Sequence, residues 1–389
     1  MLTLIRNADV LSPEPLGRCD VLLCAGRVVA LEATIEKPRQ IACEELDVEG
    51  RALIPGLVDA HVHVGGGGGE DGFASRVPAL MLSEITRAGV TSVVALLGTD
   101  TTTRTMEDLV ARTYALREEG LSAWCWTGGY AVPPRTLTGS VRGDIVFVDP
   151  IIGVGETALS DHRSSQPTFE EITKLAAECH VAGLTSGKAG VLHLHLGDGA
   201  RGLSMVARAL AETELPARVF HPTHVNRQPA LFEEAQALAR TRGLTVDVTA
   251  FPVVGDDPAI TAEDAIEQWL DAGLQRACLT VSSDGGGCLP VFDGDGRMTK
   301  MDVGKPSMLI TTLRALIAED RKLADVLPFF TSNVATQLRL RRKGRIVVGG
   351  DADLVILDRG VDVRDVMARG RWVVRAGAPT VRGTFERVG

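Results

Sequence analysis

Pro-Gly-Leu-Val-Asp-Ala-His-Val-His, at residues 55–63, is an apolar run that ends in two histidines. On a β-strand, side chains two positions apart point to the same face, so His61 and His63 could meet one metal ion. The pattern by itself also fits histidines packed in a core, because such side chains are common when their hydrogen bonds are satisfied. The choice between these interpretations depends on the polar residues further along the chain.

Short apolar runs alternate with amphipathic segments from about residue 52 onward, which is typical of repeated strand–helix units around a parallel sheet. The predicted strands are residues 52–58, 91–97, 122–126, 151–154, 191–196, 218–222, 245–249 and 277–281. Helices are predicted between them, for example over residues 168–182, 229–241 and 262–272. Eight such strands favour an α/β fold of the (β/α)8 TIM-barrel type.

The two ends of the chain have a different pattern. Apolar runs at residues 21–23 and 28–31 flank a turn at Gly26, as in a hairpin. Short strands separated by glycines are predicted at residues 346–348, 354–357, 363–368 and 372–375. We therefore expect residues 1–54 and 345–389 to form one small β-sandwich domain, with the barrel of residues 55–344 inserted between them.

Composition narrows the class of protein. The formal charge is −9 and aromatic residues make up 4% of the 389 residues, which argues against binding to nucleic acid or to an anionic membrane. No apolar run approaches the roughly 20 residues that span a bilayer, and we expect a cytoplasmic protein. The seven cysteines form no CxxC pair, so any metal site should use nitrogen and oxygen ligands.

Polar residues follow several of the other predicted strands. His195 ends the fifth strand and His224 the sixth, Asp284 follows the eighth, and Glu156 follows the fourth. Functional residues of such barrels come from the carboxyl ends of several strands, where they meet at one mouth. Core packing does not explain so many nitrogen and oxygen donors at separate strand ends. The remaining histidines are interpreted mostly as structural, although His193 could donate a hydrogen bond from behind the mouth.

In these residues the chain resembles the amidohydrolase superfamily, and within it the isoaspartyl (β-aspartyl) dipeptidases. The resemblance is carried by residues 55–63, 66–70, 97–100, 160–164, 222–227 and 282–285. It implies two bound metal ions, with His61, His63, His195, His224 and Asp284 among the ligands, and assembly as a homo-oligomer. Zinc is favoured by imidazole and carboxylate ligands, with manganese, iron or cobalt as alternatives.

One position departs from the family pattern. The family bridges its two metals with a carboxylated lysine before the Ser-Asp-His-Arg segment, whereas this chain has Glu156 there and an extra residue, Gly155. A glutamate is shorter, so it can bridge only if the backbone moves inward, which a bulge at a glycine would allow. We therefore expect Glu156 to bridge directly, with no carboxylated lysine. The alternative is a solvated Glu156 and a single metal.

The resemblance also implies roles in chemistry. Metal-bound hydroxide would attack the amide, and Asp284 would take its proton and pass it to the leaving amine. Tyr130 resembles the phenol that stabilises the oxyanion. Cys288 stands where the family has a serine near the substrate, and Thr99 resembles a further substrate contact.

Three charged residues suggest the substrate. Glu70, after five glycines, resembles the residue that holds an α-ammonium group, and Arg163 and Arg227 resemble those that bind carboxylates. Together they fit a small β-aspartyl dipeptide. Two alternatives stay open: another amidohydrolase acting on cyclic amides or N-acyl amino acids, and a non-catalytic scaffold on the same fold.

Overall fold

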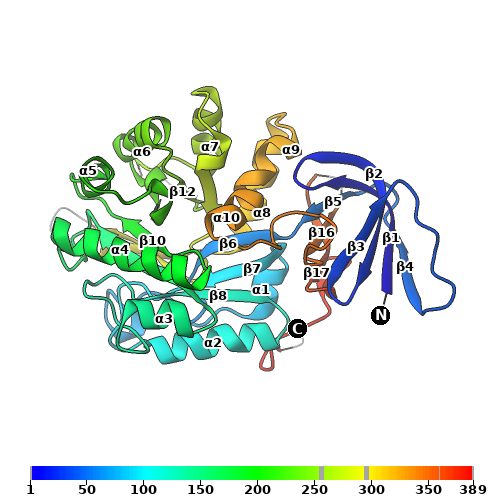
Figure 1. Cartoon of the computed structure of the whole chain (residues 1–389), viewed down its shortest axis with the longest axis horizontal. Coiled ribbons are helices and arrows are strands. Elements are labelled where there is room, and N and C mark those ends of the chain that lie inside the picture. The colour runs from blue at the N-terminus through cyan, green and yellow to red at the C-terminus, as the bar shows by residue number, and fades with distance from the viewer. Residues whose placement is uncertain (1, 254–257, 293–297, 359, 388–389) are drawn as a thin grey trace.

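A barrel of parallel strands forms the larger part of the computed structural model, which describes residues 2–253, 258–292, 298–358 and 360–387 (Figure 1). Its strands are β6 Leu57–Val62, β7 Val90–Ala95, β8 Ser122–Thr127, β9 Ile151–Leu159, β10 Val191–Leu196, β11 Phe220–Thr223, β12 Val246–Thr249 and β13 Leu279–Ser282. Strands β6 to β11 pair in chain order, and β12 pairs with β13. Because every barrel strand runs in the same direction, their carboxyl ends share one rim.

The last strand returns to the first. A bridge joins Val62 to Gly285, and the backbone N–H of Ser283 donates to the Asp59 carboxylate on β6 over 3.2 Å. The Ser283 hydroxyl also donates to Asp59, so one buried carboxylate ties the two edges of the barrel together. The predicted (β/α)8 fold is confirmed.

Helices cover the outside of the barrel (Figure 1). They are α1 Leu82–Thr86, α2 Met106–Glu118, α3 Val141–Phe147, α4 Phe169–Ser186, α5 Ser204–Glu212, α6 Pro229–Arg242, α7 Ala262–Asp271, α8 Ser307–Ala318, α9 Leu323–Val326 and α10 Ser332–Gln337. Helix α4 shows how the sequence sets such an element. Thr168 and Glu171 form a capping box at its start, and Gly187 ends it in the left-handed conformation. Among the described residues, no helix is long and apolar enough to cross a membrane.

Strands from both chain ends form one mixed sheet beside the barrel, where the blue and the orange-to-red ribbons meet in Figure 1. Its order is β19-β18-β17-β16-β5-β1-β2-β3, and β4 pairs with β1. The strands are β1 Leu2–Leu11, β2 Pro15–Cys24, β3 Arg27–Glu32, β4 Cys43–Asp47, β5 Ala52–Pro55, β16 Leu354–Leu357, β17 Val363–Ala368, β18 Arg371–Arg375 and β19 Ala378–Pro379. A β domain built from both ends was predicted, while the proposed boundaries at residues 54 and 345 stay predictions.

Several predicted elements differ from those observed. The predicted first strand, residues 52–58, is divided at Gly56, so that β5 joins the terminal sheet and β6 opens the barrel. A Cβ on Gly56 would lie 2.1 Å from the Thr91 hydroxyl, so only glycine fits this crossing. The strand predicted at residues 346–348 is absent from the described structure. There the Ser12 hydroxyl bonds both the N–H and the carbonyl of Ile346, and so replaces a strand partner.

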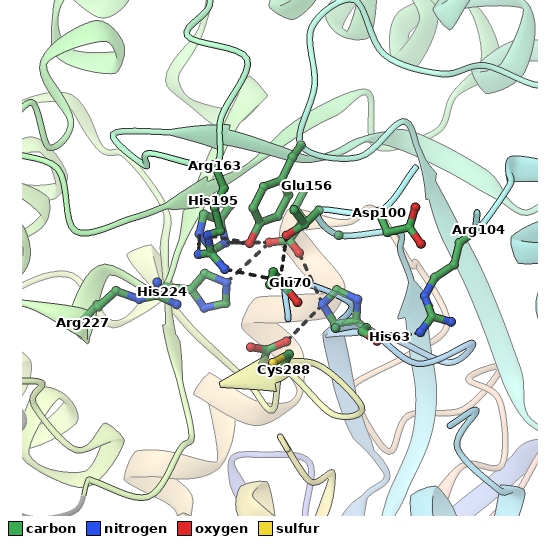
Figure 2. Close-up of a pocket in the computed structure, with 16 residues that line it drawn as sticks. His63, Glu70, Asp100, Arg104, Glu156, Arg163, His195, His224, Arg227 and Cys288 are labelled. Carbon is green, nitrogen blue, oxygen red and sulfur yellow. Dashed lines mark hydrogen bonds and ion pairs between the residues drawn. The ribbon is translucent and has the colours of Figure 1, made fainter. Parts of the chain in front are cut away.

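The fourth barrel strand differs most. It was predicted to end at residue 154, but β9 continues to Leu159 and therefore contains Glu156 instead of preceding it. After β13, strands β14 Cys288–Phe292 and β15 Met298–Val303 form an antiparallel hairpin. This hairpin brings Cys288 back toward the mouth of the barrel, where it lines the same cavity as Glu70 and His63 (Figure 2).

Candidate active site

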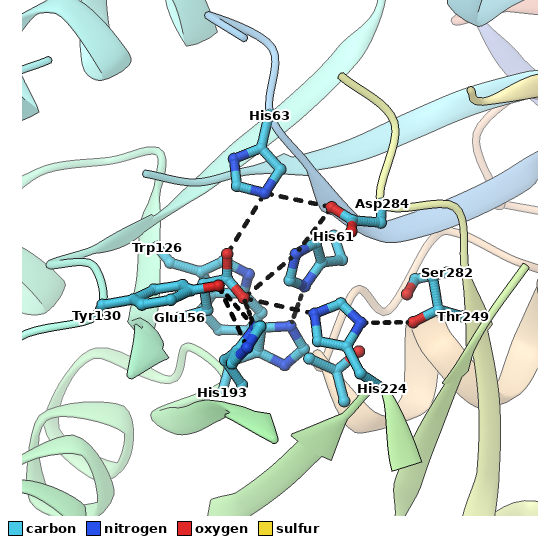
Figure 3. Close-up of polar contacts among 12 residues, drawn as sticks. His61, His63, Trp126, Tyr130, Glu156, His193, His224, Thr249, Ser282 and Asp284 are labelled. Atoms are coloured by element: carbon cyan, nitrogen blue, oxygen red, sulfur yellow. Dashed lines mark hydrogen bonds and ion pairs between the residues drawn. The ribbon is translucent and has the colours of Figure 1, made fainter. Parts of the chain in front are cut away.

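The carboxyl ends of five strands bring the predicted metal ligands together (Figure 3). His61 lies on β6 and His63 directly after it, Glu156 lies on β9, His195 on β10, His224 after β11 and Asp284 after β13. Their donor atoms form three overlapping groups, each within 4.8 Å: His61 with His63 and Glu156, His61 with His224 and Asp284, and Glu156 with His195 and His224. All six residues are at least 95% buried.

Glu156 lies between two pairs of histidines. Its Oε1 atom is 3.3 Å from Nε2 of His63, and its Oε2 atom is 3.5 Å from Nε2 of His61. The same Oε2 atom lies 2.9 Å from Nδ1 of His195 and 3.5 Å from Nε2 of His224. Oε1 thus faces one imidazole and Oε2 faces three, so this one carboxylate lies within reach of both pairs of histidines.

A bulge in β9 gives Glu156 this position. Val154 lies opposite Leu192 on β10 and Thr157 lies opposite Leu194, so Gly155 and Glu156 together face the single residue His193. One extra residue in a strand bends it and redirects a side chain. A Cβ on Gly155 would lie 2.8 Å from Cβ of His193, so the close approach of β9 to β10 requires glycine. The bulge predicted at this glycine is confirmed.

The donor atoms fit divalent transition-metal ions. Donors about 2.1 Å from a tetrahedral zinc ion lie about 3.4 Å apart. Asp284 Oδ1 is 3.2 Å from His63 Nε2 and 3.5 Å from His61 Nε2, which matches that spacing. Moreover, His61 Nε2 and Asp284 Oδ1 are buried without a hydrogen-bond partner among the described residues. Because an unpaired buried polar atom is costly, these two atoms are suited to a bound cation.

The pKa values of the clustered residues also favour a bound cation. Burial would raise the pKa of Glu156, but the imidazoles of His61 and His195 outweigh it and hold that pKa well below its usual range. Burial would lower the pKa of His61, but the Glu156 and Asp284 carboxylates reverse this and raise it. Burial lowers the pKa of His224 to about 3. The buried carboxylates of Glu156 and Asp284, both with lowered pKa values, therefore stay ionised and attract positive charge.

A polar cavity opens above the cluster (Figure 2). It is lined by His63, Gly67, Gly68, Glu70, Gly98, Thr99, Asp100, Arg104, Tyr130, Glu156, Arg163, His195, His224, Arg227, Asp284 and Cys288. All predicted substrate-binding residues are in this lining, and so are all predicted metal ligands except His61, which is completely buried. A Cβ on Gly98 would lie 2.9 Å from the His63 ring, so the wall has no room for a larger residue there.

Opposite charges meet on one wall of this cavity. Glu70 Oε1 accepts a hydrogen bond of 2.9 Å from the Thr99 hydroxyl and lies 3.5 Å from Nη1 of Arg163. Its other oxygen, Oε2, is buried without a hydrogen-bond partner among the described residues. Arg227 also lines the cavity, and its Nη1 atom lies 3.8 Å from Oδ1 of Asp198. The site can therefore receive both a cation and an anion.

Two further groups in the lining keep their protons. Burial raises the pKa of Tyr130 well above its usual range, and its hydroxyl lies 3.0 Å from Nδ1 of His195. Burial also raises the pKa of the Cys288 thiol to about 12. A protonated phenol can donate a hydrogen bond to a developing oxyanion, whereas a thiol is a weaker donor.

Sequence reasoning gave no role to three polar residues of the site. Asp161 accepts from Nη2 of Arg163 over 2.7 Å and lies 3.0 Å from Nε2 of His195, so it orients both. Arg104 donates to the carbonyls of Gly65 and Gly67, and so fixes the glycine loop that precedes Glu70. Asp100 also lines the cavity. Asp161 stands in the Ser-Asp-His-Arg segment that carried the resemblance, which was the available signal for it.

These features define a class: a β/α barrel with candidate metal ligands at the carboxyl ends of its strands, below a polar cavity. The chain belongs to the amidohydrolase family, which it matches over residues 52–373. It is accordingly a hydrolase of that superfamily. The resemblance to the isoaspartyl dipeptidases is also confirmed by solved structures.

The β-aspartyl dipeptidase of Fervidobacterium islandicum AW-1, in complex with the β-Asp-Leu dipeptide, is 41% identical with a TM-score of 0.92. The alignment covers 98% of this chain and 99% of that one. A second structure of the β-aspartyl dipeptidase from the same organism is 40% identical over the same shares, with a TM-score of 0.89. An imidazolonepropionase of Methylobacterium nodulans is 34% identical over 122 residues, and this match spans only 30% of either chain.

Proposed function

We propose that this protein hydrolyses β-aspartyl dipeptides at a centre of two divalent metal ions, with zinc as the favoured metal. The observation that carries the proposal is the wall formed by Glu70 and Arg163, 3.5 Å apart, beside the metal-ligand cluster. A dipeptide of this class has an ammonium group and two carboxylates close to its scissile amide. The 41% identical relative was solved with β-Asp-Leu, which supports the same substrate class here.

The proposed centre uses the six clustered donor residues, with Glu156 in two of their three groups. His61, His63 and Asp284 would hold one ion, His195 and His224 the other, and the two oxygens of Glu156 would join them without a carboxylated lysine. When bound, such ions polarise the scissile carbonyl and lower the pKa of a water molecule toward neutrality. The separate contacts of Oε1 with His63 and of Oε2 with His195 support this bridging role.

Substrate recognition would be electrostatic. The Oε2 atom of Glu70, which has no hydrogen-bond partner among the described residues, would accept from the α-ammonium group, while Thr99 keeps the carboxylate oriented. Arg227 would bind a substrate carboxylate. Arg163 already pairs with Asp161 through Nε and Nη2, so the Nη1 edge that faces Glu70 would meet the substrate. Cys288 lines the same cavity as a neutral thiol.

The chemical step needs a proton acceptor and an oxyanion donor. Asp284 would take a proton from the attacking water as the carbon–oxygen bond forms, and would give it to the leaving amine as the carbon–nitrogen bond breaks. Tyr130 would donate its phenolic hydrogen to the carbonyl oxygen as negative charge develops there. Both roles use residues that line the cavity.

The first experiment measures aspartate release from β-Asp-Leu and from α-Asp-Leu, together with the number of metal ions per chain. Cleavage of the β isomer alone by protein with two ions is expected. Bound metal without cleavage would reject the dipeptide, and a hydantoin or an N-acyl amino acid would then be assayed. Protein without metal would favour a scaffold. The cytoplasmic location and the homo-oligomeric state stay predictions, the latter testable by light scattering.

A further inference from the structure

A continuous chain of buried side chains runs from the candidate metal site through the barrel interior to Asp247 on β12. His61 Nδ1 lies 2.8 Å from His193 Nε2, and His193 Nδ1 lies 3.1 Å from His221 Nδ1. His221 Nε2 lies 3.0 Å from the Thr280 hydroxyl, which donates to Asp247 over 2.6 Å. All five side chains are fully buried, and Figure 3 shows the first link between His61 and His193.

The Asp247 carboxylate at the far end determines which group donates and which accepts in each hydrogen bond of this chain. Asp247 accepts from the hydroxyls of Thr280, Thr223 and Ser282, so the Thr280 hydrogen is directed toward this carboxylate. Because Thr280 gives its hydrogen to Asp247, its oxygen must accept from Nε2–H of His221. Burial lowers the pKa of His221 to about 4, which keeps this ring neutral.

The donor and acceptor roles of the three histidine rings then follow one from another. A neutral imidazole carries one N–H, so His221, protonated on Nε2, accepts on Nδ1. His193 must therefore donate from its own Nδ1 and accept on Nε2. His61 in turn donates from Nδ1, so Nε2, which lies 3.5 Å from both Glu156 and Asp284, is the atom that a neutral His61 would present to a metal.

Packing holds the middle ring in place. The indole of Trp126 on β8 stacks on His193 with centroids 5.1 Å apart and an angle of 13° between the planes. Trp126 is itself fixed, because its Nε1–H donates to the carbonyl of Ala60 over 3.1 Å. A Cβ on Gly155 would lie 2.8 Å from Cβ of His193 and 3.3 Å from the Trp126 ring, so there is little free space around this residue. The ring can therefore exchange its hydrogen-bonding roles only by changing tautomer.

We propose that Asp247, acting through Thr280, His221 and His193, sets the tautomer of His61 so that Nε2 is presented to the metal. These four are positioning residues, since none of them lines the cavity. The inference rests on the proposed metal centre. Partners that orient a metal-bound histidine typically change metal affinity by about 10–100-fold when they are removed.

The tautomers can be measured directly, without metal and without substrate. In protein labelled with ¹⁵N-histidine, long-range ¹H–¹⁵N spectra distinguish Nδ1–H from Nε2–H rings, and assignment uses His193→Gln and His221→Gln. The expected result for metal-free protein is Nε2–H at His221 and Nδ1–H at His193. The opposite tautomer at either ring would overturn the proposal, even if the protein binds two metals.

Thr280→Val tests the effect on metal binding from a distance. It removes the hydroxyl without changing the size of the side chain, so His221 loses the acceptor for its Nε2–H and the order of tautomers is no longer fixed. We expect the Kd for Zn²⁺, measured by competition with a chromophoric chelator, to rise about tenfold or more. Thr280→Ser, which restores the hydroxyl, should return it to the wild-type value.

Thr113→Val is the matched control, because this equally buried hydroxyl donates to the Leu109 carbonyl on α2, away from the site. It should leave zinc affinity unchanged. Unchanged affinity in Thr280→Val, or equal losses in both variants, would overturn the positioning role. Wild-type protein that binds no zinc would instead reject the proposed centre, and the tautomer measurement would still decide the direction of the chain.

Discussion

Glu156 lies 2.9 Å from His195 on the neighbouring strand, at the point where β9 has one residue more than β10. The family pattern has a lysine extended by a carboxylate group at this place, and a glutamate side chain is shorter by several bonds. Here the backbone supplies the missing reach, because the bulge at Gly155 moves the glutamate toward the centre of the barrel. A change of ligand and a change of strand geometry therefore occur together.

Glu156→Gln should remove at least one metal ion per chain and reduce activity. The amide keeps the size of the side chain but has one acceptor oxygen, and its NH2 group would face imidazole nitrogens. We expect metal affinity to fall by at least the roughly 10–100-fold that is typical when a hydrogen-bond partner of a metal ligand is removed. Metal analysis and turnover of β-Asp-Leu give the answer. Glu212→Gln, an exposed carboxylate paired with Arg208, is the control; two tightly bound ions in Glu156→Gln would exclude bridging.

Metal loading should not depend on carbon dioxide. A carboxylated lysine has to form from carbon dioxide, whereas the Glu156 carboxylate is present in the chain itself. Metal-free protein reconstituted with zinc in degassed buffer should reach the same metal content and activity as protein reconstituted with added bicarbonate. A clear stimulation by bicarbonate would point to a carboxylated lysine elsewhere and would contradict direct bridging.

Tyr130→Phe should lower kcat by on the order of 10²–10³-fold while KM and metal content change little. The phenol is buried beside His195 and its pKa is raised by burial, so it keeps its proton at neutral pH. Its contribution would arise only in the transition state. Tyr114→Phe changes a 41% exposed tyrosine and provides the control. An equal loss in kcat and in bound metal would assign Tyr130 to the ligand shell instead.

Glu70→Gln should weaken selection for the α-ammonium group. Removing one partner of a buried ion pair typically costs at least about 2 kcal/mol, or about 30-fold in kcat/KM for β-Asp-Leu. N-succinyl-leucine has the same shape without the amine, so the wild-type protein should cleave it poorly and the variant should cleave it equally poorly. If kcat/KM falls by the same factor for β-Asp-Leu and for N-succinyl-leucine, Glu70 does not recognise the ammonium group, and the N-acyl alternative gains support.

Local sequence pattern predicted the fold because each barrel strand is a compact apolar run followed by polar residues. It also indicated the six candidate ligand positions, since strand ends converge in any such barrel. Strands β1 and β4 were missed for physical reasons. A register shift between Ile5 and Ala8 interrupts β1, and β4 is a largely exposed strand with polar residues, so neither has regular alternation.

Individual hydrogen bonds between side chains on different strands could not be predicted. The sequence shows Asp161 next to a histidine and an arginine, but its bond to His195 depends on how the loop after β9 folds back. In the same way, His193 and His221 have the apolar neighbours of core residues, and only their side-by-side positions on β10 and β11 reveal a connected chain. Residue type indicates which chemistry is available, and the pairing of strands determines which groups meet.

Gly155→Ala tests whether the bulge and the ligand depend on each other. A Cβ there would lie 2.8 Å from Cβ of His193 and 3.3 Å from the Trp126 ring, so β9 and β10 would have to separate. Overpacking of this kind typically costs about 1–3 kcal/mol, which urea unfolding of the metal-free protein would measure. Gly65→Ala, whose Cβ would meet only Asp108 at 3.9 Å, should change the free energy of unfolding by less than about 0.5 kcal/mol.

The separation of β9 from β10 in Gly155→Ala would also carry Glu156 away from His63 and His195. Zinc content should therefore fall in this variant even under conditions where the protein stays folded. A variant that is destabilised yet keeps full zinc content would mean that Glu156 reaches its partners without the bulge.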